Sequence, residues 1–194
     1  MTDPSFESLR PEDVLSFAKT NAHYNGYELL KKLKRKKLKI ATAESMTAGL
    51  MFSTLVDIPF AGSCKYGSFC VYDTDAKKVL LSITDSNVYS HKCVEEMAIG
   101  VLEKTNATFA ISISGNSMPY KEDLKKLGEV FIGIAAYNKD RTIRVETHLI
   151  KLASPEWKTI HTSMLSSIIR TLAVQVAFEK ACEFIDNYYT PLKI

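Results

Sequence analysis

The chain has 194 residues, of which 46% are hydrophobic and 24% charged, and its formal charge at neutral pH is +3. This size suits one domain with a short appendage, and the apolar fraction is sufficient for a substantial core. No stretch is long and apolar enough to cross a bilayer, and the N-terminus lacks the basic and apolar pattern of a signal peptide. We therefore expect a soluble, cytoplasmic protein without a membrane partner.

The cysteines and histidines exclude the common metal and disulfide frameworks. The four cysteines form no CxxC pair, and no Cys/His cluster has the spacing of a zinc site. Without an export signal, reduced and buried thiols are the default expectation. We predict no metal ion and no other cofactor.

The positive charge is concentrated in one run, because seven basic residues lie between Lys31 and Lys39 and the rest of the chain is net negative. Such a run can bind nucleic acid or serve as a signal for nuclear entry. No aromatic residues are interleaved with these charges to stack on bases. A solvated helix end is therefore the favoured interpretation, and nucleic-acid binding is the weaker one.

The first third of the chain predicts two helices, a strand and a further helix. Residues 1–25 are expected to form an extension that contains a short helix starting at Pro11. Asn25-Gly26 predicts a break, followed by a second helix from Tyr27 to Lys37 and by the main domain, residues 26–190. Leu38 to Thr42 predicts a short strand. Met46 to Val56 predicts a helix that is apolar on nearly every side, as in a buried helix.

The remaining chain alternates between strands and helices. Strands are predicted over residues 66–72, 108–114, 129–137 and 141–152, and helices over 76–81 and 91–105. A long C-terminal helix is expected to be capped by Ser154-Pro155-Glu156, with Met164, Ile168, Leu172 and Val176 on its apolar stripe. This alternation predicts an α/β fold with a mixed β-sheet sandwiched by helices.

The junction around Ser45 is the most informative part of the chain. A predicted strand turns there into a predicted helix, and a helix start exposes N–H groups that can bind an anion or an oxyanion. By position alone, however, Ser45 is explained as a helix cap, Lys77 as an exposed helix lysine and Tyr72 as an aromatic residue at a strand edge. Both interpretations of Ser45 stay open on these grounds.

Three segments with matched spacing resemble the C-terminal domain of the competence-damage protein CinA, a family that includes the nicotinamide-nucleotide amidases. The segment Thr42–Gly49 is close to the family's TAESCTGG. Ile58-Pro59 is followed by Gly67, Tyr72 and Asp75-Ala76-Lys77, which is similar to the family's VPG…GG…YSNEAK. Ala110–Gly115, Pro119 and Gly128–Ile132 form the third match. The resemblance covers about residues 25–185.

The resemblance implies a catalytic set of Ser45 as nucleophile with Tyr72 and Lys77 assisting it. A neutral lysine can act as base for a serine if burial lowers its pKa, and amide groups after Ser45, at the helix start, would stabilise the oxyanion. The implied reaction converts nicotinamide mononucleotide, or a related amide, to the acid and ammonia. The implied partners are a small nucleotide substrate and further copies of the chain in a homo-oligomer. The residues expected to bind substrate are Glu44, Met46, Thr47, Ala48, Gly49, Ser114, Gly115, Asn116 and Ser117.

Two segments depart from the family pattern and keep an alternative open. The glycines that follow the family's third motif are missing after Pro119, and the family's arginine before the last helix has no counterpart around Lys158. Both changes affect groups that suit phosphate binding. The alternative is a catalytically altered family member that acts as a nucleotide-binding or assembly module.

Overall fold

The computed structural model describes residues 10–119, 125–152 and 160–188, and this part of the chain contains one five-stranded sheet with the order β2-β1-β3-β4-β5. The strands are β1 (Ile40–Glu44), β2 (Lys65–Cys70), β3 (Phe109–Gly115), β4 (Glu129–Tyr137) and β5 (Ile143–Lys151). β1 is parallel to β2 and β3, whereas β4 is antiparallel to β3 and β5. The α/β fold with a mixed sheet is therefore confirmed.

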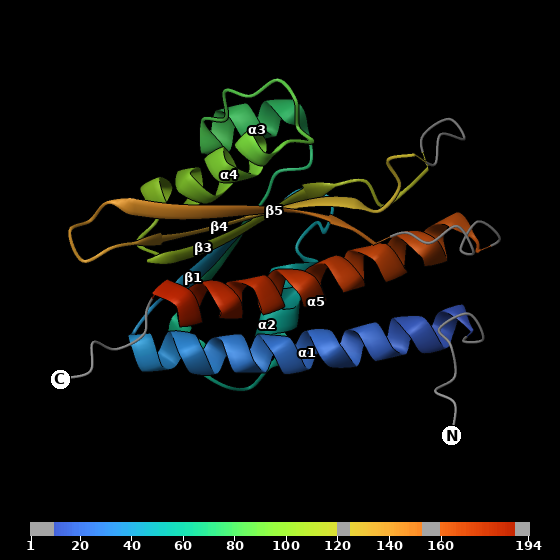
Figure 1. Cartoon of the computed structure of the whole chain (residues 1–194), viewed down its shortest axis with the longest axis horizontal. Coiled ribbons are helices and arrows are strands. Elements are labelled where there is room, and N and C mark those ends of the chain that lie inside the picture. Colours follow the sequence, from blue (N-terminus) through green and yellow to red (C-terminus); the bar gives the residue numbers. More distant parts are fainter. Residues whose placement is uncertain (1–9, 120–124, 153–159, 189–194) are drawn as a thin grey trace.

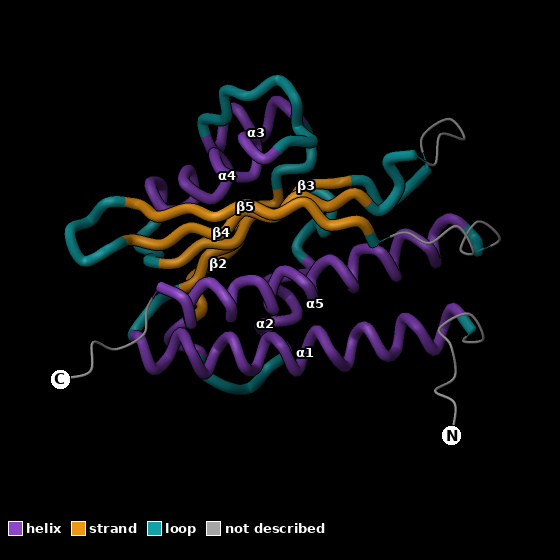
Figure 2. The backbone as a smooth tube through the Cα atoms, in the orientation of Figure 1, coloured by secondary structure: helices purple, strands orange, loops and turns teal. Residues whose placement is uncertain are grey.

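Helices cover both faces of this sheet (Figures 1 and 2). α3 (Thr74–Leu81) and α4 (His91–Lys104) lie on one face, and α1 (Pro11–Lys36), α2 (Leu50–Asp57) and α5 (Thr162–Tyr188) lie on the other. Successive residues of a strand point to opposite faces. Ala110 therefore belongs to the core under α4, whereas its neighbour Ile111 belongs to the core shared with α1 and α5.

The side of the sheet under α4 is lined by small residues, which allow the helix to come close. Ala41, Ala43, Ala110 and Ala135 belong to this core. At Gly133 on β4, an added Cβ would lie 2.4 Å from the carbonyl oxygen of Val94. α4 is thus held tightly against strands β1, β3 and β4.

The predicted break at Asn25-Gly26 is wrong, because α1 continues without interruption from Pro11 to Lys36. Gly26 is buried against α5, where an added Cβ would lie 3.2 Å from Cε2 of Phe178. The Asn25 side-chain amide donates to the carbonyl oxygen of Gln175, also on α5. Packing of the two helices therefore overrides the weak intrinsic helix propensity of this dipeptide. The helix crosses position 25/26, and the division into an extension and a main domain stays a prediction.

The basic run forms the last turns of α1 and the link to β1. Lys31 pairs with Glu28, Lys32 pairs with Asp186 on α5, and the Lys34 amine lies 4.7 Å from the centre of the Phe60 ring. Cations at a helix C-terminus also complement the helix dipole. These contacts give part of the run a structural role.

The C-terminal helix differs in detail from its prediction. The expected cap at residues 154–156 lies outside the described residues, and α5 begins at Thr162. Of the predicted stripe only Ile168 is fully buried, because α5 packs between α1 and the sheet and buries a wider surface. In the described ranges, no helix combines the length and the apolar character of a membrane span.

We expect Gly100→Ala to lower the free energy of unfolding by about 1–3 kcal/mol, because overpacking at a backbone contact forces the helices apart. A Cβ at Gly100 on α4 would lie 2.5 Å from the carbonyl oxygen of Leu81, the last residue of α3. Urea unfolding measures the change. Gly62→Ala is the matched control, since nothing lies within 4 Å of its Cβ position. Equal stability of the two variants would contradict this prediction.

Candidate active site

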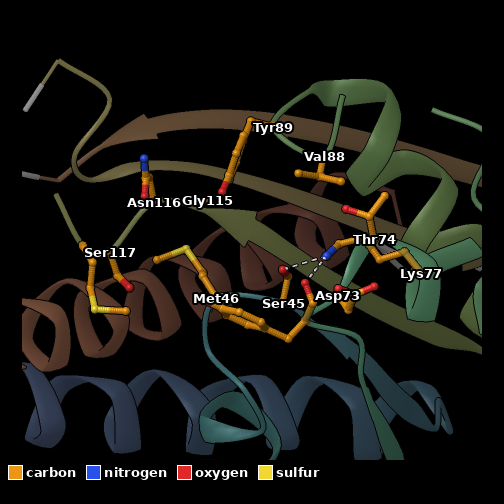
Figure 3. Close-up of a pocket in the computed structure, with 12 residues that line it drawn as sticks. Ser45, Met46, Asp73, Thr74, Lys77, Val88, Tyr89, Gly115, Asn116 and Ser117 are labelled. Carbon is orange, nitrogen blue, oxygen red and sulfur yellow. Dashed lines mark hydrogen bonds between the residues drawn. The ribbon is translucent and has the colours of Figure 1, made fainter. Parts of the chain in front are cut away.

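A cavity of about 210 Å³ lies at the carboxyl ends of β1, β2 and β3 (Figure 3). This is where ligands bind in open α/β sheets. Its wall combines segments that follow these strands with the loop before α4. The lining residues are Ser45, Met46, Tyr72, Asp73, Thr74, Lys77, Val88, Tyr89, Gly115, Asn116, Ser117 and Met118.

The structure brings Ser45 and Lys77 into direct contact. Nζ of Lys77 donates to Oγ of Ser45 at 3.0 Å and to the carbonyl oxygen of Tyr72 at 2.9 Å. In Figure 3 the Lys77 nitrogen points toward the Ser45 oxygen, and a dashed line joins the two atoms. A nucleophile and a base separated by a hydrogen-bond distance are the geometric requirement for an activated serine.

Lys77 reaches this position because of how α3 begins. The Asp73 carboxylate accepts from the amide of Asp75 and caps the helix, which places Lys77 in its first turns. Helical side chains lean toward the N-terminus of their helix. The Lys77 amine therefore lies over the start of α3 and reaches back to Tyr72 and Ser45.

Burial changes the acid–base properties of Lys77. The side chain is 2% exposed, and no salt bridge to it occurs in the described part of the chain. Burial lowers the pKa of the Lys77 amine, and the acidic groups of Cys93 and Asp73 oppose this shift. The neutral amine, which can accept a proton, is thereby favoured. The opposition from Cys93 requires its thiolate, and burial raises the pKa of that thiol to about 11.

Tyr72 lies at the cavity, but its contact with Lys77 is made by the backbone. Its carbonyl oxygen accepts the hydrogen bond from Lys77, whereas its side chain is 68% exposed. Among the described residues, no hydrogen bond joins the Tyr72 hydroxyl to Ser45 or Lys77. A catalytic role of this hydroxyl stays a prediction.

The helix after Ser45 starts later than expected. α2 begins at Leu50, so Ser45 does not lie at a helix N-terminus and the expected helix over 46–49 is wrong. The buried carboxylate of Glu44 occupies that terminus, where it accepts from the amides of Met51 and Phe52 at 2.9 and 2.8 Å. Glu44 also accepts from the Thr42 hydroxyl. Glu44 therefore holds the strand-to-helix junction and does not line the cavity.

Residues 45–49 form a tight turn instead. The amide of Ser45 donates to the carbonyl oxygen of Ile113, and the amide of Ala48 donates to that of Ser45. Ala48 and Gly49 both have positive φ angles, of 49° and 91°. This left-handed pair delays the helix. Of the four residues expected here to bind substrate, the cavity wall includes Met46 but not Thr47, Ala48 or Gly49.

The predicted residues at the end of β3 divide in the same way. Gly115, Asn116 and Ser117 line the cavity, whereas Ser114 does not. The Ser114 hydroxyl donates to the carbonyl oxygen of Val88 at 2.7 Å and so supports the loop before α4. At Gly115 an added Cβ would lie 2.7 Å from Sδ of Met46, so a glycine is needed for the close approach of the two wall segments.

Sequence reasoning missed the contribution of the loop between α3 and α4. This loop supplies Val88 and Tyr89 to the cavity. Its conformation is set by the Glu96 carboxylate on α4, which accepts from the amides of Thr84 and Asp85. No motif signals these positions. Asp73, Thr74 and Met118 were also missed, although Asp73 and Thr74 lie between the two catalytic candidates Tyr72 and Lys77.

No cluster of three or more His, Cys, Asp or Glu side chains within the described ranges converges in a way that could hold a metal ion. The described residues offer a serine, a desolvated amine, backbone amides and polar side chains at the cavity wall.

The comparison with protein families decides the relationship. The model of the CinA C-terminal domain matches residues 26–179. The chain belongs to the CinA C-terminal domain family. It is 36% identical over 116 residues to the Protein MG115 homolog of Mycoplasma pneumoniae, a match that covers 57% of this chain and 74% of that protein.

Longer relatives contain more than this domain. The chain is 36% identical over 124 residues to a putative competence-damage inducible protein of Streptococcus thermophilus, with 61% of this chain and 29% of that protein covered. The chain thus matches less than a third of the length of this relative.

Solved structures support the fold. A CinA superfamily protein from Klebsiella pneumoniae superimposes with a TM-score of 0.72 at 21% identity, covering 86% of this chain and 99% of that chain. The CihA protein from Agrobacterium tumefaciens gives a TM-score of 0.68 at 23% identity, covering 82% and 93% of the two chains. At these identities the similarity demonstrates the CinA-like α/β fold.

We expect Glu44→Gln to lower the free energy of unfolding by about 1.5–3 kcal/mol, the range for a lost hydrogen bond to a charged group. The amide NH₂ of glutamine would face an N–H donor at the start of α2, where the carboxylate now accepts from both Met51 and Phe52. Urea unfolding compares this variant with Glu95→Gln, an exposed position on α4. Equal losses in the two variants would show that Glu44 is not the cap of α2.

Lys77 also predicts a pH dependence of stability. The pKa of Lys77 is lowered from 10.5 in the folded chain, so the unfolded chain binds more protons between the folded pKa and 10.5. Stability from this group therefore rises as the pH rises through that window. Urea unfolding at several pH values up to 10.5 should show a rise in wild type that is absent in Lys77→Met. Parallel curves for the two proteins would contradict a desolvated, titrating Lys77.

Proposed function

We propose that this chain is a serine amidohydrolase that converts the carboxamide of nicotinamide mononucleotide, or of a related amide, to the acid and ammonia. The observation that carries the proposal is the buried amine of Lys77, 3.0 Å from the Ser45 hydroxyl in the wall of a cavity. The association of the CinA C-terminal domain with nicotinamide mononucleotide amidase activity supports the choice of substrate.

The first half of the reaction follows from this geometry. A neutral Lys77 keeps one N–H on the carbonyl oxygen of Tyr72 and turns its lone pair to the Ser45 hydroxyl. Ser45 Oγ attacks the carboxamide carbon as its proton moves to Lys77, which forms a tetrahedral intermediate. Lys77 then gives the proton to the leaving nitrogen, the C–N bond breaks, and ammonia departs from the acyl-enzyme.

The second half uses the same groups with water as nucleophile. Lys77 takes a proton from the water, which attacks the acyl carbon, and the ester bond to Ser45 breaks as its oxygen regains a proton. The acid is released and the serine is restored. The carbonyl oxygen bears negative charge in both tetrahedral intermediates, and one backbone donor to such an oxyanion contributes about 3 kcal/mol.

The amides of Met46 and Thr47 are the candidate oxyanion donors. The amides of Ser45 and Ala48 donate to carbonyl oxygens within the protein. Among the described residues, by contrast, the amides of Met46 and Thr47 have no acceptor. They directly follow the nucleophile in a turn, so these donors do not depend on a helix N-terminus.

The rest of the wall suits a flat ring that carries a polar substituent. Tyr72, Tyr89 and Met118 offer aromatic and sulfur surfaces, and Asn116 and Ser117 offer hydrogen-bonding groups. The nicotinamide ring of a nucleotide would lie against the aromatic and sulfur surfaces, and its sugar would lie toward the hydrogen-bonding groups.

The test is ammonia release from the purified protein with nicotinamide mononucleotide, nicotinamide riboside, nicotinamide and NAD. Ser45→Ala and Lys77→Met should each reduce turnover by at least about 1,000-fold, as expected for a nucleophile and its base. The controls are Ser53→Ala and Lys78→Met, which alter an exposed serine of α2 and the exposed lysine next to Lys77.

Equal release by wild type and Ser45→Ala across the panel would overturn the enzymatic proposal. Binding of a nucleotide that is insensitive to Lys77→Met would then favour the alternative, a family member that binds without turnover.

A further inference from the structure

We propose that Arg170 on α5 is a positioning residue that holds the 45–49 turn in the geometry in which Ser45 reacts. This inference rests on the amidohydrolase function proposed above. It assigns a task to a helix that supplies no side chain to the cavity wall within the described ranges.

The contact joins segments that are 123 residues apart in the sequence. Nη2 of Arg170 donates to the carbonyl oxygen of Thr47 at 2.6 Å. Thr47 lies two residues after the nucleophile, and its amide is one of the two candidate oxyanion donors. The Arg170 guanidinium therefore holds the peptide segment that orients both the Ser45 hydroxyl and the candidate oxyanion donors.

The turn needs such support because its backbone conformation is unfavourable. Ala48 has a φ of 49°, and a left-handed conformation at a non-glycine residue costs about 1–2 kcal/mol. From the side of β1, Glu44 fixes the start of α2. From α5, Arg170 donates to the carbonyl oxygen of Thr47 in the middle of the turn. With only one of these contacts, the segment between Ser45 and Leu50 has room to relax.

The Arg170 contact is not required to satisfy the Thr47 carbonyl. This oxygen also accepts from the amide of Leu50 at 3.1 Å. In addition, Nε of Arg170 is buried without a hydrogen-bond acceptor in the part of the chain that the structure describes. A buried unsatisfied donor costs about 1–3 kcal/mol. The arginine is therefore a poor choice for stability alone, which favours a role in positioning.

The same helix contacts a second segment of the cavity wall one turn earlier. The Ser166 hydroxyl donates to the Ser117 hydroxyl at 3.1 Å, and both side chains are buried. Residues four apart lie on the same face of a helix. One face of α5 thus holds the nucleophile turn through Arg170 and the 115–117 segment through Ser166, and fixes their separation.

The kinetic consequence follows from where Arg170 lies. A displacement of about 1 Å between reacting groups can reduce the rate by about 100-fold. Loss of Arg170 is therefore expected to lower kcat, whereas KM should change little because Arg170 does not contact the cavity.

The experiment compares wild type, Arg170→Met and Arg170→Lys in ammonia release from nicotinamide mononucleotide. Methionine keeps an unbranched side chain and removes the donor, and lysine restores one donor to Thr47. We expect kcat of Arg170→Met to fall about 10- to 100-fold with KM within about twofold. Lysine should recover part of kcat. Arg144→Ala is the control, since the Arg144 guanidinium stacks 3.3 Å from the Tyr188 ring at the far end of α5.

A second readout separates this inference from the proposed function. Hydrogen–deuterium exchange should be faster at the hydrogen-bonded amides of Ala48 and Leu50 in Arg170→Met than in wild type, while α1 and α5 stay protected and the thermal midpoint stays within a few degrees. If wild type releases no ammonia, the proposed function fails, and exchange still decides whether Arg170 holds the turn. Unchanged exchange at Ala48 and Leu50 would overturn the inference. An unchanged kcat, or a loss of kcat that lysine does not recover, would overturn it equally.

Discussion

A lysine amine can act as a base near neutral pH only where water and neighbouring anions do not keep it charged. In this chain Lys77 is almost completely buried, its amine donates to a serine and a backbone carbonyl, and burial lowers its pKa. Most other features of the site serve to keep this pair in place. α3 is capped at its start by Asp73, rests at its end on Gly100, and so presents Lys77 at a fixed depth.

The serine side of the pair is fixed by a different set of contacts. Ser45 directly follows the carboxyl end of strand β1. The carboxylate of the preceding residue, Glu44, accepts from two amides at the start of α2. The anion-binding helix terminus is therefore occupied by a group of the protein itself. What remains for an oxyanion is the turn between Ser45 and Leu50, whose conformation depends on contacts from Ile113 and Arg170.

Features that depend on local sequence patterns were well predicted. β4 matches its predicted range because a continuous apolar run has no competing interpretation, and the alternation of strands with helices was sufficient for the fold class. The family motifs indicated Ser45 and Lys77, which the structure brings together. The agreement concerns the fold class and one strand, and the catalytic roles of Ser45 and Lys77 stay predictions.

The errors arise where contacts between distant residues decide the outcome. The dipeptide Asn25-Gly26 predicts a break between two helices, but contacts with Phe178 and Gln175 on α5 keep it helical. The residues after Ser45 have a helical composition, yet the left-handed Ala48 and Gly49 delay the helix to Leu50. Val88 and Tyr89 could not be found from motifs, because a carboxylate on α4 and a hydroxyl on β3 place their loop.

The uninterrupted α1 helix has a consequence for how much of the chain is needed for independent folding. The family match begins at residue 26, in the middle of this helix, while α5 packs along α1 and Ala22 is buried in the core that both helices share. A fragment cut at that position would leave part of the apolar surface of α5 in contact with water. Such a surface promotes self-association. We therefore expect a fragment that keeps the whole of α1 to be more stable than one that begins at residue 26.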